Sequence, residues 1–524
     1  MILAQNLLPQ LSGNNWYKLL IIVVFIGACT PLKPVSDGDG EDDELDEIVN
    51  EFPDKKDDSD VIVIGGDDDK DNKTDTTNPK DPQNPTDPTN TKGGNVDNNN
   101  NEDNNTGDDS NNSDGNDGIV IIDPNDNNTN DGNNDSYYLK STYDVSILMP
   151  LQADAVNIAA DKMPRSAVRG MNFYEGSLLA LQQLSAEGIN LNVSVYDTKR
   201  SPAVVQALID NQSLSAKDLI IGPASTENLR IVANAMQATN TPIVSLNLNS
   251  RIASEHPNYI QASPYFNSHA EAIIKYVKSK YPNRTVVLAA PSEGSDANRF
   301  SAYQNANALT SNDGILPIKE YIEGKADKST YKFTSIQNYL TPGDTTIFIV
   351  PSSNQEYVSG LMRTLSLTRK RFPVVMFGMP KWLSFEKIDY QYYENLNVHI
   401  STSTHINKLE PNTRSFAQQF FTSYGMFPTS EAYKGYDLML YFGRMLHKYG
   451  TDFLNKLDSS PAEHLHSRFA FERIPVNTGV IEEGNYKIKQ YENKYVNILR
   501  FRDFYFQRVN PAFFTETVID PTRN

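Results

Sequence analysis

From residue 143 onward, short apolar runs alternate with longer stretches in which apolar residues recur every three to four positions. The short runs are nearly continuous in Val, Ile and Leu, which is typical of parallel strands buried on both faces of a sheet. They read "YDVSILMPL", "INLNVSVYD", "AKDLIIGP" and "TPIVSLNL". The stretches between them have helical spacing and read "RGMNFYEGSLLALQQLSAEG", "SPAVVQALIDNQS" and "STENLRIVANAMQAT". This alternation predicts a parallel sheet covered by helices.

The pattern then starts a second time, through "NYIQASPYFNSHAEAIIKYVKSKYP". The next predicted strands read "RTVVLAAPSEGSD", "DTTIFIVPSSN", "FPVVMFGMP" and "NLNVHISTSTH". A long helix in "SEAYKGYDLMLYFGRMLHKYG" is expected to cross back to the first sheet, and the segment that ends in "KYVNILRF" predicts short antiparallel hairpins. The predicted fold class is therefore α/β, with parallel sheets flanked by helices in two lobes over residues 137–524.

A short apolar run, residues 19–28, precedes Cys29, the only cysteine of the chain. The run is about half of the roughly 20 residues that a membrane-spanning helix needs, and it has the length of the apolar region of a signal peptide. The stretch "IGAC" resembles a bacterial lipobox, in which the cysteine carries a lipid after cleavage. We therefore predict a lipoprotein signal peptide over residues 1–28 and lipidation at Cys29. The alternatives are an uncleaved anchor helix or a buried cysteine without a role.

Residues 29–136 are dominated by Asp, Asn, Gly, Thr and Pro, and aromatic residues are almost absent. Such a segment cannot bury enough apolar surface to offset its ordering entropy, so a long disordered linker is expected. It carries roughly −25 of charge, whereas the whole chain carries −19, and the remainder is therefore about +6. The acidity of the chain consequently says little about the ligand of the folded part.

Two apolar islands interrupt this linker, "DSDVIVIGGDDD" and "NDGIVIIDPND". Each island either pairs as a lone strand with the edge of a partner or has no fixed structure. Clustered aspartates suit calcium, but the spacing of an EF-hand loop is missing, so we predict no metal site.

Residues 143–510 resemble the type I periplasmic binding proteins, specifically the branch that binds leucine, isoleucine and valine. The resemblance rests on "ILMPL", "GMNFYEGSLLAL", "LIIGPASTEN", "YIQASP" and "SEAYKGYDLMLYF", in this order along the chain. It implies a ligand site in a cleft between the lobes. The same branch includes activator lipoproteins of peptidoglycan synthases, so the fold alone leaves more than one function open.

Open α/β sheets bind ligands at the carboxyl ends of their strands, and the site candidates follow from this rule. Ser225 and Thr226 begin a predicted helix, where backbone N–H groups favour an anion, although Ser225 could also serve only as a helix cap. The resemblance places Asn247 and Asn249 where amino-acid binders hold the ligand's amino and carboxylate groups. The alternative for these asparagines is a role in turn geometry.

Three further candidates are Gln152, Ser292 and Trp382. Trp382 could stack on a ligand or pack in the core. Its loop, "FGMPKWL", contains Lys381 and lacks the acid that amino-acid binders present to the ligand's ammonium group. This difference argues against a free α-amino acid as the ligand.

The sequence contains none of the nucleophile, zinc-protease, phosphate-loop or dinucleotide motifs that we sought, so a non-enzyme without a cofactor is expected. It also has no sustained basic patch for nucleic acid. Two functions remain. The first is a lipid-anchored solute-binding protein of an ABC transporter, or a sensor, that binds an amino-acid-like or other polar solute. The second is a cell-envelope protein that regulates a peptidoglycan synthase. Either would be anchored in the bacterial envelope, with the outer membrane expected.

Overall fold

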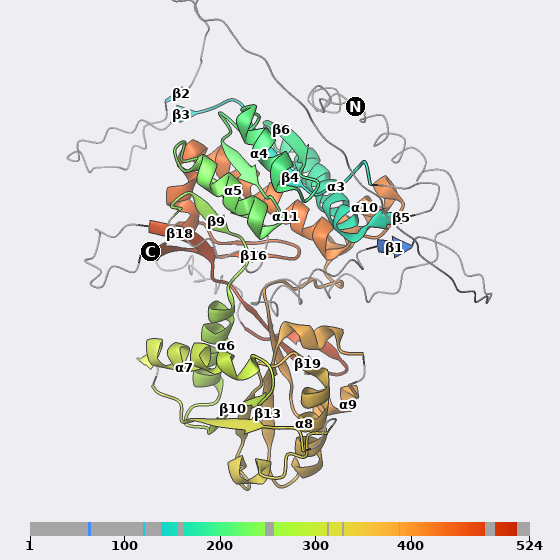
Figure 1. Cartoon of the computed structure of the whole chain (residues 1–524), viewed down its shortest axis with the longest axis vertical. Coiled ribbons are helices and arrows are strands. Elements are labelled where there is room, and N and C mark those ends of the chain that lie inside the picture. Colours follow the sequence, from blue (N-terminus) through green and yellow to red (C-terminus); the bar gives the residue numbers. More distant parts are fainter. Residues whose placement is uncertain are drawn as a thin grey trace, which may run out of the picture.

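The computed structural model describes residues 61–63, 119–120, 138–155, 162–246, 256–311, 314–326, 330–386, 388–476 and 488–510. These residues form two lobes, each built on a seven-stranded sheet (Figure 1). The predicted fold class is confirmed. The predicted signal peptide and Cys29 lie outside the described residues, and so does almost all of the predicted linker.

Lobe 1 contains a sheet in which every described strand is parallel to its neighbours except the edge strand β17. In spatial order its strands are β17 (Phe471–Pro475), β18 (Ile488–Asn493), β9 (Tyr259–Gln261), β8 (Ile243–Ser245), β7 (Leu219–Ile221), β4 (Tyr143–Met149) and β6 (Leu191–Asp197). Its helices are α3 (Arg165–Ala186), α4 (Pro202–Asp210), α5 (Thr226–Met236), α10 (Pro411–Tyr424), α11 (Ser430–Tyr449) and the 3-10 segment η7 (Gly450–Ser459).

Lobe 2 repeats this plan with parallel central strands and two antiparallel strands at one edge. In spatial order its strands are β11 (Ile318–Glu323), β10 (Val286–Pro291), β12 (Thr346–Ile349), β13 (Val374–Gly378), β14 (His399–Thr402), β19 (Asn497–Arg502) and β20 (Tyr505–Arg508). Its helices are α6 (Phe266–Lys280), α7 (Phe300–Leu309), α8 (Gln355–Thr368) and α9 (Tyr390–Asn395), with 3-10 segments η3 (Asp296–Arg299), η5 (Ile336–Tyr339) and η6 (Pro380–Ser384).

The continuous apolar runs of the sequence are the central strands of both sheets. Every residue of β7, β10 and β13 is buried, as expected for parallel strands covered by helices on both faces. The long predicted helix α11 returns to lobe 1, where it packs against α3. Two glycines permit this close approach, because a Cβ atom at Gly176 would overlap the carbonyl of Ala432 and one at Gly435 would overlap the carbonyl of Phe173.

The chain passes between the lobes in three described segments, and these segments define how the sheets face each other. It leaves lobe 1 after β9 and after β18, and it leaves lobe 2 after β14. These strands run parallel to the central strands of their own sheets. The carboxyl edge of each sheet therefore points toward the other lobe (Figure 1).

Both apolar islands of the linker pair with short strands next to the folded lobes. Strand β1 (Val61–Val63) runs antiparallel to β5 (Lys162–Pro164), immediately before α3. Strand β2 (Ile119–Val120) pairs with β3 (Tyr138–Leu139). Of the two alternatives for the islands, the structure has strand pairing, with partners in the same chain.

Candidate functional site

The candidate site is the space between the two carboxyl edges. On the lobe 1 side it is bordered by the loops after β4 and β7, and on the lobe 2 side by those after β10, β12 and β13. Parallel α/β sheets bind ligands at this edge. The crossing segments close one side of the space and form the hinge.

Ser225 is the N-cap of α5, the helix that follows β7. Its hydroxyl oxygen accepts a hydrogen bond from the backbone N–H of Asn228 at 3.3 Å. A hydroxyl that accepts in this way still carries a proton to donate. The capping role is therefore present, and it leaves the Ser225 hydroxyl proton available for a ligand. Thr226 is the first helical residue and is half-buried.

Gly222 brings the start of this loop close to the neighbouring strand. Its φ is 90°, and a Cβ atom there would overlap the carbonyl of Leu148 at the end of β4. Only glycine fits both conditions. The loop that leads to Ser225 is thereby held against the carboxyl end of β4, where the loop with Gln152 begins.

Gln152 is engaged within lobe 1. Its backbone has φ 44°, its N–H donates to Asp197 Oδ1 at 3.0 Å, and its side-chain oxygen accepts from the Ser166 hydroxyl. Asp197 is the last residue of β6 and also accepts from the N–H of Ala153 at 3.2 Å. These bonds fix the loop after β4 onto the sheet edge and the start of α3.

Asn228 is a candidate that the sequence reasoning missed. It is 1% exposed, and neither its Nδ2 nor its Oδ1 has a hydrogen-bond partner in the described structure. It shares the buried face of α5 with Leu229 and Val232, so it faces the sheet near its carboxyl edge. A buried amide without partners costs free energy unless another group bonds to it. The sequence did not indicate that the Asn228 side chain is unpaired, because its position fits the helical periodicity of the residues that α5 buries.

The remaining candidates differ in their surroundings. Asn247 and Asn249 lie outside the described residues. Ser292 is exposed at the end of β10, and its N–H donates to Glu323 O at 3.0 Å.

Trp382 is 1% exposed, its ring overlies Gly378, and its indole N–H donates to Ser352 O at 2.8 Å. Its ring packs in the core of lobe 2, which is the alternative stated above, and it presents no face to a ligand.

The lobe 2 edge carries polar groups that bond to one another. Glu293 accepts from the N–H of Lys325 at 3.0 Å and from the Tyr331 hydroxyl at 3.2 Å, and Lys325 pairs with Glu356 at 3.1 Å. Burial, together with the charge of Glu293, raises the pKa of Tyr331 to about 12, so this hydroxyl stays protonated. Ser353 Oγ, in the loop between β12 and α8, has no partner in the described structure.

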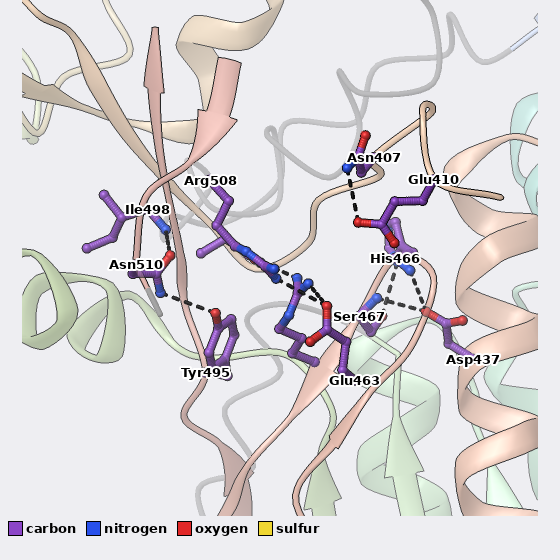
Figure 2. A network of polar contacts seen from close by, with 12 residues as sticks. Asn407, Glu410, Asp437, Glu463, His466, Ser467, Tyr495, Ile498, Arg508 and Asn510 are labelled. Atoms are coloured by element: carbon purple, nitrogen blue, oxygen red, sulfur yellow. Dashed lines mark hydrogen bonds and ion pairs between the residues drawn. The ribbon is translucent and has the colours of Figure 1, made fainter. Parts of the chain in front are cut away.

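The hinge surrounds a small cavity of ≈ 10 Å³, about the space that one water molecule needs. Residues from all three crossing segments line it, among them Ser263, Thr404 and Asn493, and α11 adds Lys434. A polar network next to the cavity is drawn in Figure 2. Within the described ranges, no group of three or more His, Cys, Asp and Glu side chains is placed to hold a metal ion.

Comparisons with solved structures agree with this architecture. A putative branched-chain amino acid ABC transporter protein from Rhodospirillum rubrum matches 70% of this chain and 100% of its own, with 13% identity and a TM-score of 0.52. One from Silicibacter pomeroyi matches 72% and 98%, with 11% identity and a TM-score of 0.46. The match to the Rhodospirillum rubrum protein, which has the TM-score above 0.5, shows that the chain has the type I periplasmic-binding-protein fold, and at this identity the likeness shows the fold alone. No protein-family model matches the chain, and no curated protein is similar to it in sequence.

No helix in the described ranges is both long and apolar enough to cross a bilayer.

Proposed function

We propose that this protein is an extracytoplasmic solute-binding protein that holds a small polar ligand between its lobes, for an ABC transporter or as a sensor. The observation that carries the proposal is the unpartnered amide of Asn228, buried at the carboxyl edge of lobe 1 beside the capped start of α5. Together with the Ser225 hydroxyl it supplies donors and an acceptor. Thr226, Asn247 and Asn249 complete the proposed lobe 1 side, with Ser292 opposite.

A ligand with an anionic or carbonyl group fits this set best. The N-terminus of α5 favours negative charge, and the hydroxyl of Ser225 and the amide of Asn228 both donate hydrogen bonds. The similar solved structure from Rhodospirillum rubrum is described as a putative branched-chain amino acid ABC transporter. The loop with Lys381 lacks the acid that an α-ammonium group needs. We therefore rank free amino acids below solutes with an additional anionic or carbonyl group.

Binding needs no reaction chemistry, and the role proposed here is not enzymatic. The membrane anchor in this proposal is a lipid on Cys29, supported by the lipobox-like "IGAC". Since β1 pairs with β5 beside α3, roughly 30 residues separate Cys29 from the lobes, and these would span about 30 Å if flexible, enough to carry the lobes away from a membrane surface. The outer membrane is the proposed site.

A thermal-shift screen tests solute binding. The probes are amino acids, short peptides, sugars and muropeptides, added to the mature chain with Cys29→Ser. A ligand at a hundredfold excess over Kd stabilises the native state by about 2.7 kcal/mol, which for lobes of this size corresponds to roughly 3–4 °C. If no class of solute shifts the melting temperature, the proposal is wrong.

Two substitutions separate capping from binding. Ser225→Ala removes the hydroxyl and the cap, whereas Ser225→Asn removes the hydroxyl and keeps a capping side chain. We expect both variants to lose ligand affinity, and only Ser225→Ala to lose stability without ligand. Equal ligand shifts in wild type and both variants would exclude Ser225 from the site.

The second candidate function is regulation of a peptidoglycan synthase. The length of the linker favours it, because a protein that serves a nearby permease needs less reach. Direct binding of the mature chain to a purified synthase, with no solute hit in the screen, would favour this function over the first.

A further inference from the structure

The hinge is reinforced by a short hairpin, β15 (Ala462–Glu463) and β16 (Arg468–Phe469), which we call the hinge hairpin. The hairpin belongs to lobe 1 by connection, because it follows η7 and leads into β17. Its strands are only two residues long, so its own ladder cannot hold it in place. Side-chain bonds to both lobes do so instead.

Asp437 anchors the hairpin to lobe 1. This carboxylate on α11 is 0% exposed and accepts from three successive backbone N–H groups of the hairpin turn. The donors are Leu465 at 3.2 Å, His466 at 2.9 Å and Ser467 at 2.7 Å. Figure 2 shows this carboxylate beside the turn. The turn therefore moves with α11.

The other end of the hairpin contacts lobe 2. Arg468 is 5% exposed in its side chain, pairs with Glu463 and donates to Asn497 Oδ1 at 3.1 Å, at the first residue of β19. Glu463 also pairs with Arg508 of β20 at 3.5 Å. The arginine of the hairpin and the arginine of lobe 2 thus share one carboxylate (Figure 2).

Buried asparagines join the crossing segments to one another. Asn493 is 2% exposed and donates to the carbonyls of Ala262 and Arg468, which links the first and third segments with the hairpin. Asn497 is 0% exposed and donates at 3.3 Å to the carbonyls of Thr402 and Ser403, at the start of the second segment.

The second segment also bonds directly to the hairpin. Thr404 forms a β-bridge with Ser467, and the N–H of His405 donates to His466 O at 3.0 Å. On the opposite side, Glu492 of β18 accepts from the N–H of Tyr265 and the hydroxyl of Ser268 at the start of α6. A rotation of one lobe against the other would strain the bonds that join the hairpin to β19 and to the second segment, together with those that join β18 to the start of α6.

We propose that the hinge is a lock, and that the hinge hairpin holds the two lobes at one fixed separation instead of letting them close. In a hinge that moves, a few backbone dihedrals absorb the rotation of the lobes. The hydrogen bonds around the hinge must then be the same in the open and the closed state. Here each crossing segment is bonded to another segment or to the hairpin. The lobes keep this separation whether or not a solute binds between them.

Distance measurements between spin labels test the lock. The chain has one cysteine, so Cys29→Ser gives a cysteine-free background. Labels are placed at Asn234→Cys on α5 and Arg363→Cys on α8, both exposed positions in different lobes. We expect one narrow distance in the otherwise unmodified chain.

Glu463→Gln weakens the link to Arg508, and Asp437→Asn weakens the anchor on α11. We expect a second distance or a broader distribution in each variant. The matched control is Glu187→Gln, which removes a pair with Arg444 at 2.6 Å that lies wholly within lobe 1. This control should keep the narrow distance.

Two results would overturn the proposal. One is a broad or double distribution in the chain that carries only the labels. The other is a distribution in Glu463→Gln that matches the Glu187→Gln control. The Glu463 and Glu187 side chains are each about one-third exposed, but Glu463→Gln also removes the charge partner of the buried Arg468, so the folding of both variants is checked by melting temperature.

Discussion

Replacing Asn228 with leucine should stabilise the ligand-free protein. The side chain is 1% exposed, and both of its polar atoms lack partners in the described structure. A buried unpaired amide costs about 1–3 kcal/mol, and leucine has the same branched outline, with as many side-chain heavy atoms, without that cost. With an unfolding entropy of about 2.1 cal/mol/K per residue over roughly 370 residues, this gain corresponds to about 1–4 °C.

The assay is thermal and urea denaturation of wild type and Asn228→Leu without ligand, followed by the solute screen. The matched control is Asn307→Leu, because Asn307 is equally a buried asparagine. Its amide donates to Leu316 O at 3.0 Å, and its carbonyl accepts from Leu316 N at 3.0 Å. The control should be destabilised, since it leaves two backbone groups unpaired.

A lower melting temperature in Asn228→Leu would refute this reasoning, since it would mean that the amide makes bonds in the folded protein. If the variant is more stable and still binds solute as wild type does, Asn228 is a cost without a role in binding. Greater stability with loss of binding is the outcome that the proposed site requires.

Three further predictions concern other parts of the chain. Burial raises the pKa of Glu175 from 4.5 to about 7, so the free energy of unfolding should fall as pH rises from about 4.5 to 7, by at most about 1.4 kcal/mol per pH unit. Glu175→Gln should reduce this loss of stability. Identical curves of stability against pH for wild type and variant would contradict the shifted pKa. Cys29→Ser should abolish lipid attachment and shift the protein from the membrane fraction to the soluble fraction; unchanged fractionation would exclude the anchor. Gly176→Ala should push α3 away from Ala432 and lower stability by roughly 1–3 kcal/mol, measured by urea denaturation; an unchanged midpoint would mean that the helices adjust freely.

The sequence predicted the central strands because their signal is local. In β10, six consecutive buried residues are apolar or proline, and the following helix has its own spacing. The edge strands were harder to predict from the sequence. Strand β18 reads "IKQYEN", with four buried residues of which three are polar, and its place beside β9 depends on a partner far away in the chain. The antiparallel hairpins were predicted, but their addition to both main sheets was not.

The site was predicted only in part, and for a similar reason. Ser225 could be located because a helix start has a sequence signature. Trp382 could not be assigned to core or cleft, because both roles use the same residue type and only Gly378 beneath the ring decides between them. The locked hinge gave no signal at all. The hydrogen bond from Ser467 N–H to the Asp437 carboxylate joins two segments 30 residues apart, and the residue pattern of neither segment predicts this contact.

The order of the strands also has a consequence for biosynthesis. Lobe 1 needs β17 and β18, and lobe 2 needs β19 and β20, so residues 471–508 complete both sheets. A chain that emerges N-terminus first can therefore finish neither lobe until residues 471–508 have been made. Such late, long-range pairing slows folding. For the exported protein proposed above, this order would leave the chain unfolded while it crosses a membrane, and folding would be completed afterwards.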